Sequence, residues 1–430
     1  MRKYQQLLLL VISCVSVIIL LMYKSENNHL KGVLQVINFF SRNDAAIMKR
    51  IESNSSMYLR DFTYPLAVWQ TIGTNFHSYS AYWRRNELVS GGDAMAIVVG
   101  RKGAVLNFKC SFNFKGSPNI QGKFRFQRVD KDGEDDNSEF TRYYFYCKVT
   151  RDFGTPETVI FIDSSAPKSG GNSLKLRMLK LVDKGMQKLA VHPLTICVNL
   201  HSREFFNMTS LEKQPQELLQ FFVHHYIMGV EDFIAYSGDD IPFSLHPFLS
   251  HFNIRVHSMP FNFPFSSANS TDRIRSIIEM DCILRNINRA THSILLDANE
   301  FFYPNTNLDD EKSLLHSLRS YDNGVNQFDV KTFAICKDQR HKYLIENTLF
   351  DPELKNSHGV SLYRPQDNVL PLNGEEPSRS ITLPVLKCLV HRYVNCVHVG
   401  KDGLHDWRNT LREDFMQHIQ RLKEEIQLLI

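Results

Sequence analysis

An alternation of strand and helix patterns between residues 190 and 300 restricts the fold most strongly. Four short apolar runs are typical of buried strands, and the segments between them repeat apolar residues at helical spacing. Strands are expected at residues 194–200, 232–236, 253–257 and 293–296, and helices at 216–228, 242–252 and 273–288. This alternation predicts an α/β fold with a mostly parallel twisted sheet and flanking helices, and a ligand site at the carboxyl ends of the strands.

The chain before this alternation follows another pattern. Residues 61–170 contain short β-branched or aromatic runs separated by turns, which predicts a β-rich accessory module. A serine- and glycine-rich stretch at 164–172 indicates a linker to the main domain at 190–410. The tail, 411–430, has helical spacing with alternating charge and is expected to form an amphipathic helix packed on that domain.

An apolar run near the N-terminus predicts a membrane location. Residues 7–22 are almost entirely apolar and follow two basic residues, Arg2 and Lys3. The run ends without the small residues of a signal-peptide cleavage site. We therefore expect a cytoplasmic tail at 1–6, an uncleaved transmembrane signal anchor at 7–23 and a lumenal stem at 24–60, as in a single-pass type II Golgi membrane protein. The alternative is a cleaved signal peptide.

Cysteine usage agrees with a lumenal location. Seven cysteines and three N-x-S/T sequons lie beyond the apolar run, and an oxidising lumen favours disulfides. Cys110 is expected to pair with Cys147 in the β-rich region, and Cys388 with Cys396. The odd number leaves one cysteine free or intermolecular, so a disulfide dimer is possible and the oligomeric state stays open.

Charge and motif content exclude several functions. The formal net charge is +4, from 50 basic and 46 acidic residues, with no dense block of lysine and arginine. Nucleic acid is therefore not expected as a partner. The chain also contains neither a G-x-G-x-x-G motif nor a P-loop, so phosphates are not expected in a glycine cradle.

The segment 293–304, SILLDANEFFYP, points most directly to chemistry. A buried strand runs into Asp297 and Asn299, which strand periodicity places on the same side. Two oxygen donors at a strand's carboxyl end suit a hard cation, Mn²⁺ or Mg²⁺, bridging to a diphosphate. The alternative is a strand-terminal turn, where aspartate and asparagine are common for local reasons.

Several blocks in order resemble the family 92 glycosyltransferases, formerly a domain of unknown function, over residues 190–410. Residues 219–236 are similar to the family's block with an xxHxxxGV core, 279–285 to its "nDClyr" helix and 296–304 to its "DxDE…P" metal motif. Residues 79–82, YSAY, are similar to its "SAY" segment. The resemblance implies an A-type glycosyltransferase fold, a nucleotide-sugar donor and divalent-metal dependence. For characterised members it implies inverting galactosyl transfer to glycoprotein glycans.

The resemblance also implies metal ligands. Asp297 and Asn299 match the metal motif, and His398 matches the family's C-terminal histidine. Asn299 stands where the family has a second aspartate, so one negative charge is lost and the affinity for metal should fall. Glu300 can compensate for this loss; otherwise the enzyme is weakened or inactive.

Four further residues are candidates for substrate binding. Lys387 is similar to the lysine that precedes the histidine in the family's C-terminal block. It can contact the diphosphate, or it is an ordinary surface lysine. Asp281 and Arg285 lie one helical turn apart and can touch the nucleotide or form only a helix pair, and we favour the pair. His225 can donate beneath the donor site, although packing is the favoured interpretation.

An inverting reaction needs a carboxylate that deprotonates the acceptor hydroxyl, and Glu300 and Asp402 are the candidates. We therefore expect a glycosyltransferase that moves a hexose, galactose in the first instance, from a UDP-sugar to a glycan with Mn²⁺ or another divalent cation. The main alternative is a catalytically inactive lumenal carbohydrate-binding protein that retains the fold. A metal-dependent hydrolase of similar fold is a third possibility.

Overall fold

The computed structural model divides the chain into two units, Met1–Asp61 and Phe62–Ile430, and every described residue belongs to the second unit. The predicted tail 1–6, anchor 7–23 and stem 24–60, most of the helix expected at 242–252, and the linker 165–172 lie outside the described residues. The structure describes residues 69–86, 91–114, 119–130, 138–164, 173–177, 179–180, 192–201, 214–237, 249, 254–265, 271–305, 313–321, 324–338, 340–352, 358–365, 379–396, 404–410 and 413–429.

The expectation of a membrane-spanning protein is corrected. In the described part of the chain, no helix is long and apolar enough to cross a membrane. The longest described helix has 17 residues and is amphipathic, whereas a span requires about 20 apolar residues. This finding contradicts the predicted single-pass Golgi protein with a signal anchor, although the stretch 7–23 on which that prediction depended is itself not described.

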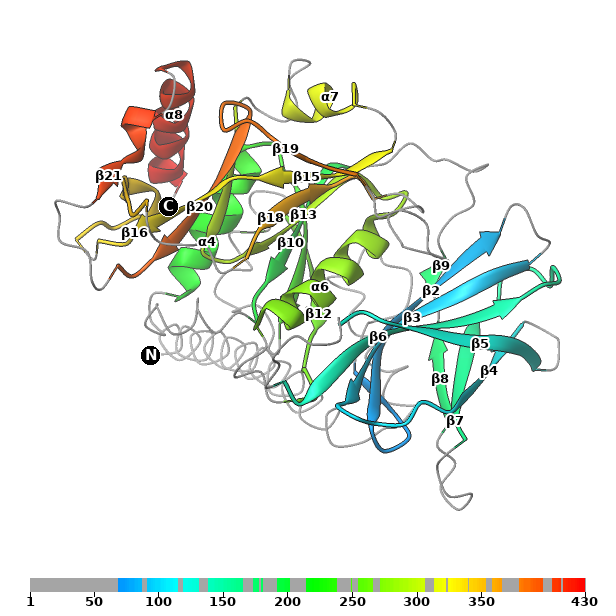
Figure 1. Ribbon diagram of the computed structural model, residues 1–430. Helices are drawn as coiled ribbons and strands as arrows, with labels where there is room; N and C mark the ends of the chain where they lie inside the picture. The colour runs from blue at the N-terminus through cyan, green and yellow to red at the C-terminus, as the bar shows by residue number, and fades with distance from the viewer. Residues whose placement is uncertain are drawn as a thin grey trace, which may run out of the picture. The chain divides into compact units, whose positions relative to one another are not determined.

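The first of three sheets is antiparallel except for one short pairing, and it covers most of the predicted β-rich region (Figure 1). Its order is β1-β2-β3-β6-β5-β4-β7-β8, and β9 pairs with β2. Because β1 also contacts β8, the sheet curls nearly into a barrel around a core rich in phenylalanine. The strands are β1 (Gln70–Ile72), β2 (Phe76–Asn86), β3 (Gly91–Arg101), β4 (Phe108–Asn113), β5 (Ile120–Arg128), β6 (Phe140–Val149), β7 (Thr158–Asp163), β8 (Ser173–Arg177) and β9 (Leu179–Lys180).

The second sheet contains the strand–helix alternation that the sequence predicts. Its order is β12-β11-β10-β13-β18-β15-β19, and the first four strands are parallel. β18 runs antiparallel to both of its neighbours, β13 and β15. The elements are β10 (His192–Asn199), α4 (Gln214–Ile227), β11 (Asp232–Ser237), β12 (Arg255–Pro260), α6 (Thr271–Asn286), β13 (Ala290–Asp297), β15 (Val325–Val330), β18 (Val360–Tyr363) and β19 (Arg379–Thr382).

The third sheet is built from the C-terminal half of the chain and has the order β14-β20-β16-β17-β21. The helix expected in the tail is present as α8, which buries one apolar face against the core shared with the second sheet. The elements are β14 (Glu300–Pro304), α7 (Leu314–Leu318), β16 (Thr332–Cys336), β17 (Leu349–Phe350), β20 (Cys388–Val394), β21 (His405–Asp406) and α8 (Glu413–Leu429).

The predicted fold class, an α/β A-type glycosyltransferase fold with a mostly parallel sheet, is wrong. Strands far outnumber helices among the described residues, and antiparallel pairings outnumber parallel ones. The parallel part is limited to β12, β11, β10 and β13, with short parallel contacts elsewhere. The error arose because apolar periodicity predicts each element locally but does not show how many antiparallel strands join the sheet from distant segments.

The disulfides confirm one predicted pair and correct the other. Cys110 bonds to Cys147, as expected. Strand β5 passes beside this disulfide at Gly122, and a Cβ atom at that position would lie 2.3 Å from the Cys147 sulfur, so only glycine fits there. Cys388 does not pair with Cys396 and is a buried free thiol. Burial raises the pKa of Cys388 to about 12, which makes it a poor candidate for an intermolecular disulfide. The described disulfides are Cys110–Cys147, Cys197–Cys282 and Cys336–Cys396.

Candidate functional site

The candidate site lies where the order of the parallel strands reverses. From β10 the chain passes to β11 and β12 on one side and then returns to β13 on the other side of β10. Such a switch point is where open parallel sheets bind ligands, at the carboxyl ends of the strands. The last register pair of β10 and β13 is Asn199 with Asp297, and Asn199 Nδ2 donates a hydrogen bond to Asp297 Oδ1 at 2.9 Å.

Asp297 has one occupied and one open carboxylate oxygen. Oδ1 accepts from Asn199 and from the guanidinium of Arg275, whereas Oδ2 accepts no hydrogen bond from any described residue. The residue is only 3% exposed. Burial raises the pKa of Asp297 above its usual range, and the charge of Arg275 opposes that shift. A carboxylate that is held in place through one oxygen, and whose other oxygen accepts no hydrogen bond from the described residues, can bind a ligand through that second oxygen.

Glu300 begins β14 and is fully buried beside Asp297. Its Oε1 accepts from His358 Nε2 at 2.7 Å, and its Oε2 accepts from the Asp297 backbone N–H at 2.9 Å and from Arg275 at 3.1 Å. Burial alone would raise the pKa of Glu300, but Arg275 and His358 outweigh it and lower this pKa to about 2. A carboxylate so firmly ionised is a weak proton acceptor, so these contacts favour a positioning role over that of catalytic base.

His358 reaches the site through an antiparallel strand that the sequence analysis did not predict. β18 pairs with β13 at Ser293–Tyr363 and Ile294–Leu362, and this register carries the residues before β18 to the end of β13. His358 lies 58 residues after Glu300 and belongs to no recognisable ligand motif. Arg275 was missed for a similar reason, because an arginine within a helix pattern gives no indication of its partners.

The residues present fit a divalent cation. Asp297, Glu300 and His358 each offer a ligand atom, and these atoms all lie within 4.8 Å of one another. With His358 neutral, the two carboxylates and Arg275 sum to one negative charge. Carboxylate oxygens with one imidazole nitrogen suit Mn²⁺ better than a softer metal. The fit requires His358 Nε2 and Glu300 Oε1 to exchange their mutual hydrogen bond for the cation.

The other two predicted metal ligands are placed differently. β13 ends at Asp297, and Asn299 lies in the turn before β14, so the strand periodicity used to align these residues does not extend to it. The Asn299 amide donates to the Tyr393 carbonyl at 3.0 Å, and its buried Oδ1 has no hydrogen-bond partner among the described residues. His398 lies outside the described residues, as does the candidate base Asp402.

Asp281 forms a buried hub instead of an open nucleotide contact. Its carboxylate accepts hydrogen bonds from Ser80 and Tyr82 on β2, from Tyr236 on β11, and from Arg285 one turn along α6. The helix pair of Asp281 and Arg285 is therefore present, at 2.7 Å. Ser80 and Tyr82 belong to the segment 79–82 singled out in the sequence, so the hub ties the first sheet to α6.

His225 and Lys387 also have local partners. His225 Nδ1 donates to the Phe221 carbonyl at 2.8 Å, and its Nε2 accepts from the Phe302 backbone N–H at 3.1 Å. Burial lowers the pKa of His225 well below its usual value, as expected for a neutral packing histidine. Lys387 is half-buried, with Nζ 5.5 Å from the centre of the Tyr321 ring. A substrate-binding role for either residue stays a prediction.

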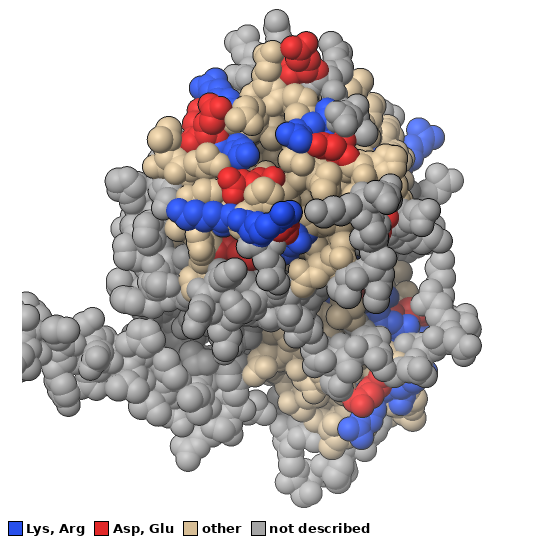
Figure 2. Space-filling view, turned by 90° about the vertical axis from the view of Figure 1, so that its left-hand side faces the viewer, with Lys and Arg blue, Asp and Glu red and all other residues tan. Residues whose placement is uncertain are grey.

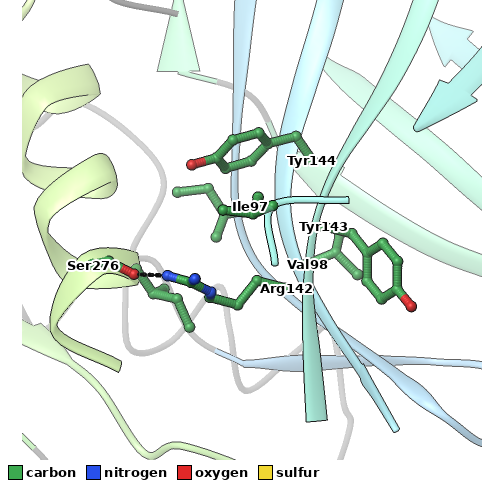
Figure 3. A pocket seen from close by; sticks show the side chains of 8 residues that line it. Ile97, Val98, Arg142, Tyr143, Tyr144 and Ser276 are labelled. Carbon is green, nitrogen blue, oxygen red and sulfur yellow. Dashed lines mark hydrogen bonds between the residues drawn. The ribbon is translucent and has the colours of Figure 1, made fainter. Parts of the chain in front are cut away.

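A second contact between α6 and the first sheet lies at a small recess (Figure 3). Arg142 on β6 points across it and donates to the Ser276 hydroxyl, while Ile97 and Tyr144 line the same recess. Arg142 is itself paired with Asp130. This contact and the Asp281 hub hold the middle of α6, the helix that carries Arg275 into the site.

Basic and acidic side chains alternate on the face shown in Figure 2, so the described residues there form no broad patch of one sign. Pairs on the molecular surface include Arg340 with Asp338 and Arg421 with Glu425.

Comparisons with known proteins add little to this geometry. No family model matches the chain, and no curated protein matches it. Among solved structures, the chain is similar to a nucleoside-diphosphate-sugar pyrophosphorylase from Vibrio cholerae RC9, with 10% identity and a TM-score of 0.22. The match covers 53% of this chain and 99% of that one. A similarity this weak supports no functional argument, and the resemblance to family 92 stays a prediction.

Proposed function

We propose that the protein is a glycosyltransferase that moves a hexose from a UDP-sugar to a glycan hydroxyl with the help of a divalent cation. The observation that carries the proposal is the position of Asp297 at the switch point of the parallel strands, where one ligand atom each of Asp297, Glu300 and His358 lies within 4.8 Å of the others. Galactose as the sugar rests only on the sequence resemblance.

Each residue of the site has a separable role in this proposal. Asp297 would hold the cation through Oδ2, while Asn199 and Arg275 hold its Oδ1 and so fix the carboxylate plane. Glu300 Oε1 and His358 Nε2 would exchange their mutual hydrogen bond for the cation, while Glu300 Oε2 keeps the hydrogen bond from the Asp297 backbone N–H. A bound divalent cation would neutralise the charge that develops on the departing nucleoside diphosphate.

One observation favours a second candidate, an inactive carbohydrate-binding protein. Both carboxylates of the site already have Arg275 as a counter-ion, and Asn299 lacks the charge that the family's motif would supply. Such a protein would bind a sugar without metal and without turnover.

The Asp297→Asn variant should reduce metal-dependent turnover at least about a hundredfold, because it removes the charged ligand but keeps the shape of the side chain. The assay measures nucleoside diphosphate released by the purified chain from a panel of UDP- and GDP-sugars, with Mn²⁺ or EDTA and with or without glycan acceptors. Asp406→Asn, which alters an aspartate paired with Arg408 away from the site, should leave turnover unchanged.

Three other outcomes would change the assignment. Turnover that persists in Asp297→Asn or in EDTA contradicts the proposed site. Release that is independent of any acceptor favours a hydrolase. The absence of turnover with every donor, together with metal-independent sugar binding, favours the carbohydrate-binding protein.

A further inference from the structure

Arg275 places a permanent positive charge inside the candidate metal site. Its Nη1 contacts Asp297 Oδ1, and its Nη2 donates to Glu300 Oε2 at 3.1 Å and to the Leu295 carbonyl at 2.9 Å. The side chain is 7% exposed. An arginine guanidinium is protonated at any working pH, so the group keeps its charge in this buried position. A guanidinium held by three acceptors cannot act as a mobile surface charge.

The helix that carries Arg275 is also fixed. Asp281, six residues further along α6, is held by hydroxyl groups of β2 and β11, and Ser276 is held by Arg142 of β6 (Figure 3). Withdrawing the guanidinium from the carboxylates would therefore require breaking buried hydrogen bonds at several positions. Arg275 must remain in place when the site binds a ligand.

A cation bound by these carboxylates meets that fixed charge. We assign Asp297 Oδ2, Glu300 Oε1 and His358 Nε2 as its ligand atoms, because Arg275 uses the other oxygen of each carboxylate. The cation and the guanidinium would then share two carboxylates in a region that excludes water, where like charges repel strongly. Arg275 thus reduces the net charge that attracts a metal and also opposes its approach.

We propose that Arg275 is an internal counter-cation that keeps the affinity for free divalent cation low, so that the cation binds together with a nucleoside diphosphate. The inference rests on the proposed function and deepens it. A diphosphate brings oxygen ligands and negative charge, which offset the repulsion by Arg275. Metal and diphosphate must therefore raise each other's affinity by the same factor. Arg275 is a positioning residue in this scheme, since it acts through Asp297 and Glu300.

The test measures Mn²⁺ binding to the full chain by titration calorimetry, with and without UDP. The wild type should bind Mn²⁺ alone weakly and at least about tenfold more tightly with saturating UDP. Arg275→Met should bind Mn²⁺ alone at least about tenfold more tightly than the wild type, and UDP should add less. Arg273→Met is the matched control, because this arginine of the same helix pairs with Asp130, and its Mn²⁺ affinity should not change.

Thermal unfolding gives a second readout that does not depend on activity. In EDTA, Arg275→Met should melt below the wild type because its two buried carboxylates lose their counter-ion. Mn²⁺ should raise the melting temperature of Arg275→Met by more than it raises that of the wild type. If Arg275→Met does not fold, Arg275→Lys serves instead. Its single ammonium spans only one carboxylate, so Mn²⁺ should bind about threefold more tightly than in the wild type.

The outcomes separate this inference from the proposed function. If the wild type binds Mn²⁺ in a way that Asp297→Asn abolishes, but neither Arg275 variant binds it more tightly, the counter-cation role is overturned and the metal site stands. If neither the wild type nor the variants bind Mn²⁺ with or without UDP, both the metal site and the inference built on it fail.

Discussion

Replacement of Asp281 by alanine is expected to lower the free energy of unfolding by about 3–5 kcal/mol, the usual cost of breaking a buried ion pair. The carboxylate is fully buried and accepts hydrogen bonds from Ser80 and Tyr82 at 2.5 Å, from Arg285 at 2.7 Å and from Tyr236 at 2.8 Å. Its loss removes the carboxylate that pairs with the buried Arg285 guanidinium and that accepts hydrogen bonds from three hydroxyl groups. The first sheet would also lose one of its contacts with α6, whereas the Arg142–Ser276 hydrogen bond would remain.

Urea-induced unfolding of the purified variants measures this loss. Asp338→Ala is the comparison, since Asp338 also pairs with a nearby arginine, Arg340, but on the surface, with side chains 33% and 77% exposed. That variant should unfold at the wild-type urea concentration, because exposed pairs contribute little to stability. Equal losses in the two variants would show that the hub does not stabilise the fold.

Acidification from pH 6.5 to 4.5 is expected to destabilise the fold by about 2–3 kcal/mol for each deeply buried histidine. Burial lowers the pKa of His391 to about 3, that of His292 to about 3 and that of His224 to about 4. These histidines become protonated near pH 6.5 in the unfolded chain but stay neutral at that pH in the folded chain. The stability that depends on their neutral form is therefore fully present above about pH 6.5. It is lost as the pH falls towards the pKa values of the folded state.

His391 gives the sharpest test of this dependence. Both of its ring nitrogens are buried without a hydrogen-bond partner among the described residues, and its ring lies against Tyr303 and Trp407. His391→Phe should therefore raise the free energy of unfolding by about 1 kcal/mol at pH 7, since it removes an unpaired polar group. The gain should increase at acid pH.

Urea unfolding at several pH values checks both parts of the prediction. The slope of stability against pH should become shallower in His391→Phe, whereas His316→Gln, at an exposed histidine, should leave the slope unchanged. A His391→Phe variant that keeps the wild-type slope would mean that this histidine does not resist protonation in the folded state.

Local patterns predicted much of the chain correctly. The apolar runs and helical spacing between 190 and 300 correspond to β10, α4, β11, β12, α6 and β13, with boundaries displaced by a few residues. The β-rich region and Cys110–Cys147 follow from runs that lie close together in the sequence. Within that region, the apolar run at 104–108 contributes only Phe108 to a strand, β4.

Long-range pairing was the principal error. Cys396 is nearest in sequence to Cys388, yet β16 lies beside β20 and brings Cys336 to it instead. In the same way, β18 joins β13 from a distant segment and turns the expected parallel sheet into a mixed one. Neither the Cys336–Cys396 disulfide nor the pairing of β18 with β13 can be predicted from the apolar pattern of the strands involved.

The sequence by itself determined that a buried parallel strand would run into Asp297, because apolar periodicity and the change to polar residues are local properties of the chain. Only the tertiary structure decided that Arg275, Glu300 and His358 surround this carboxylate, and that Asp281 is a structural hub. The physical reason is that a buried charge must find its counter-charge and hydrogen-bond donors wherever the fold brings them. Those partners lie on other elements, at separations that no local pattern records.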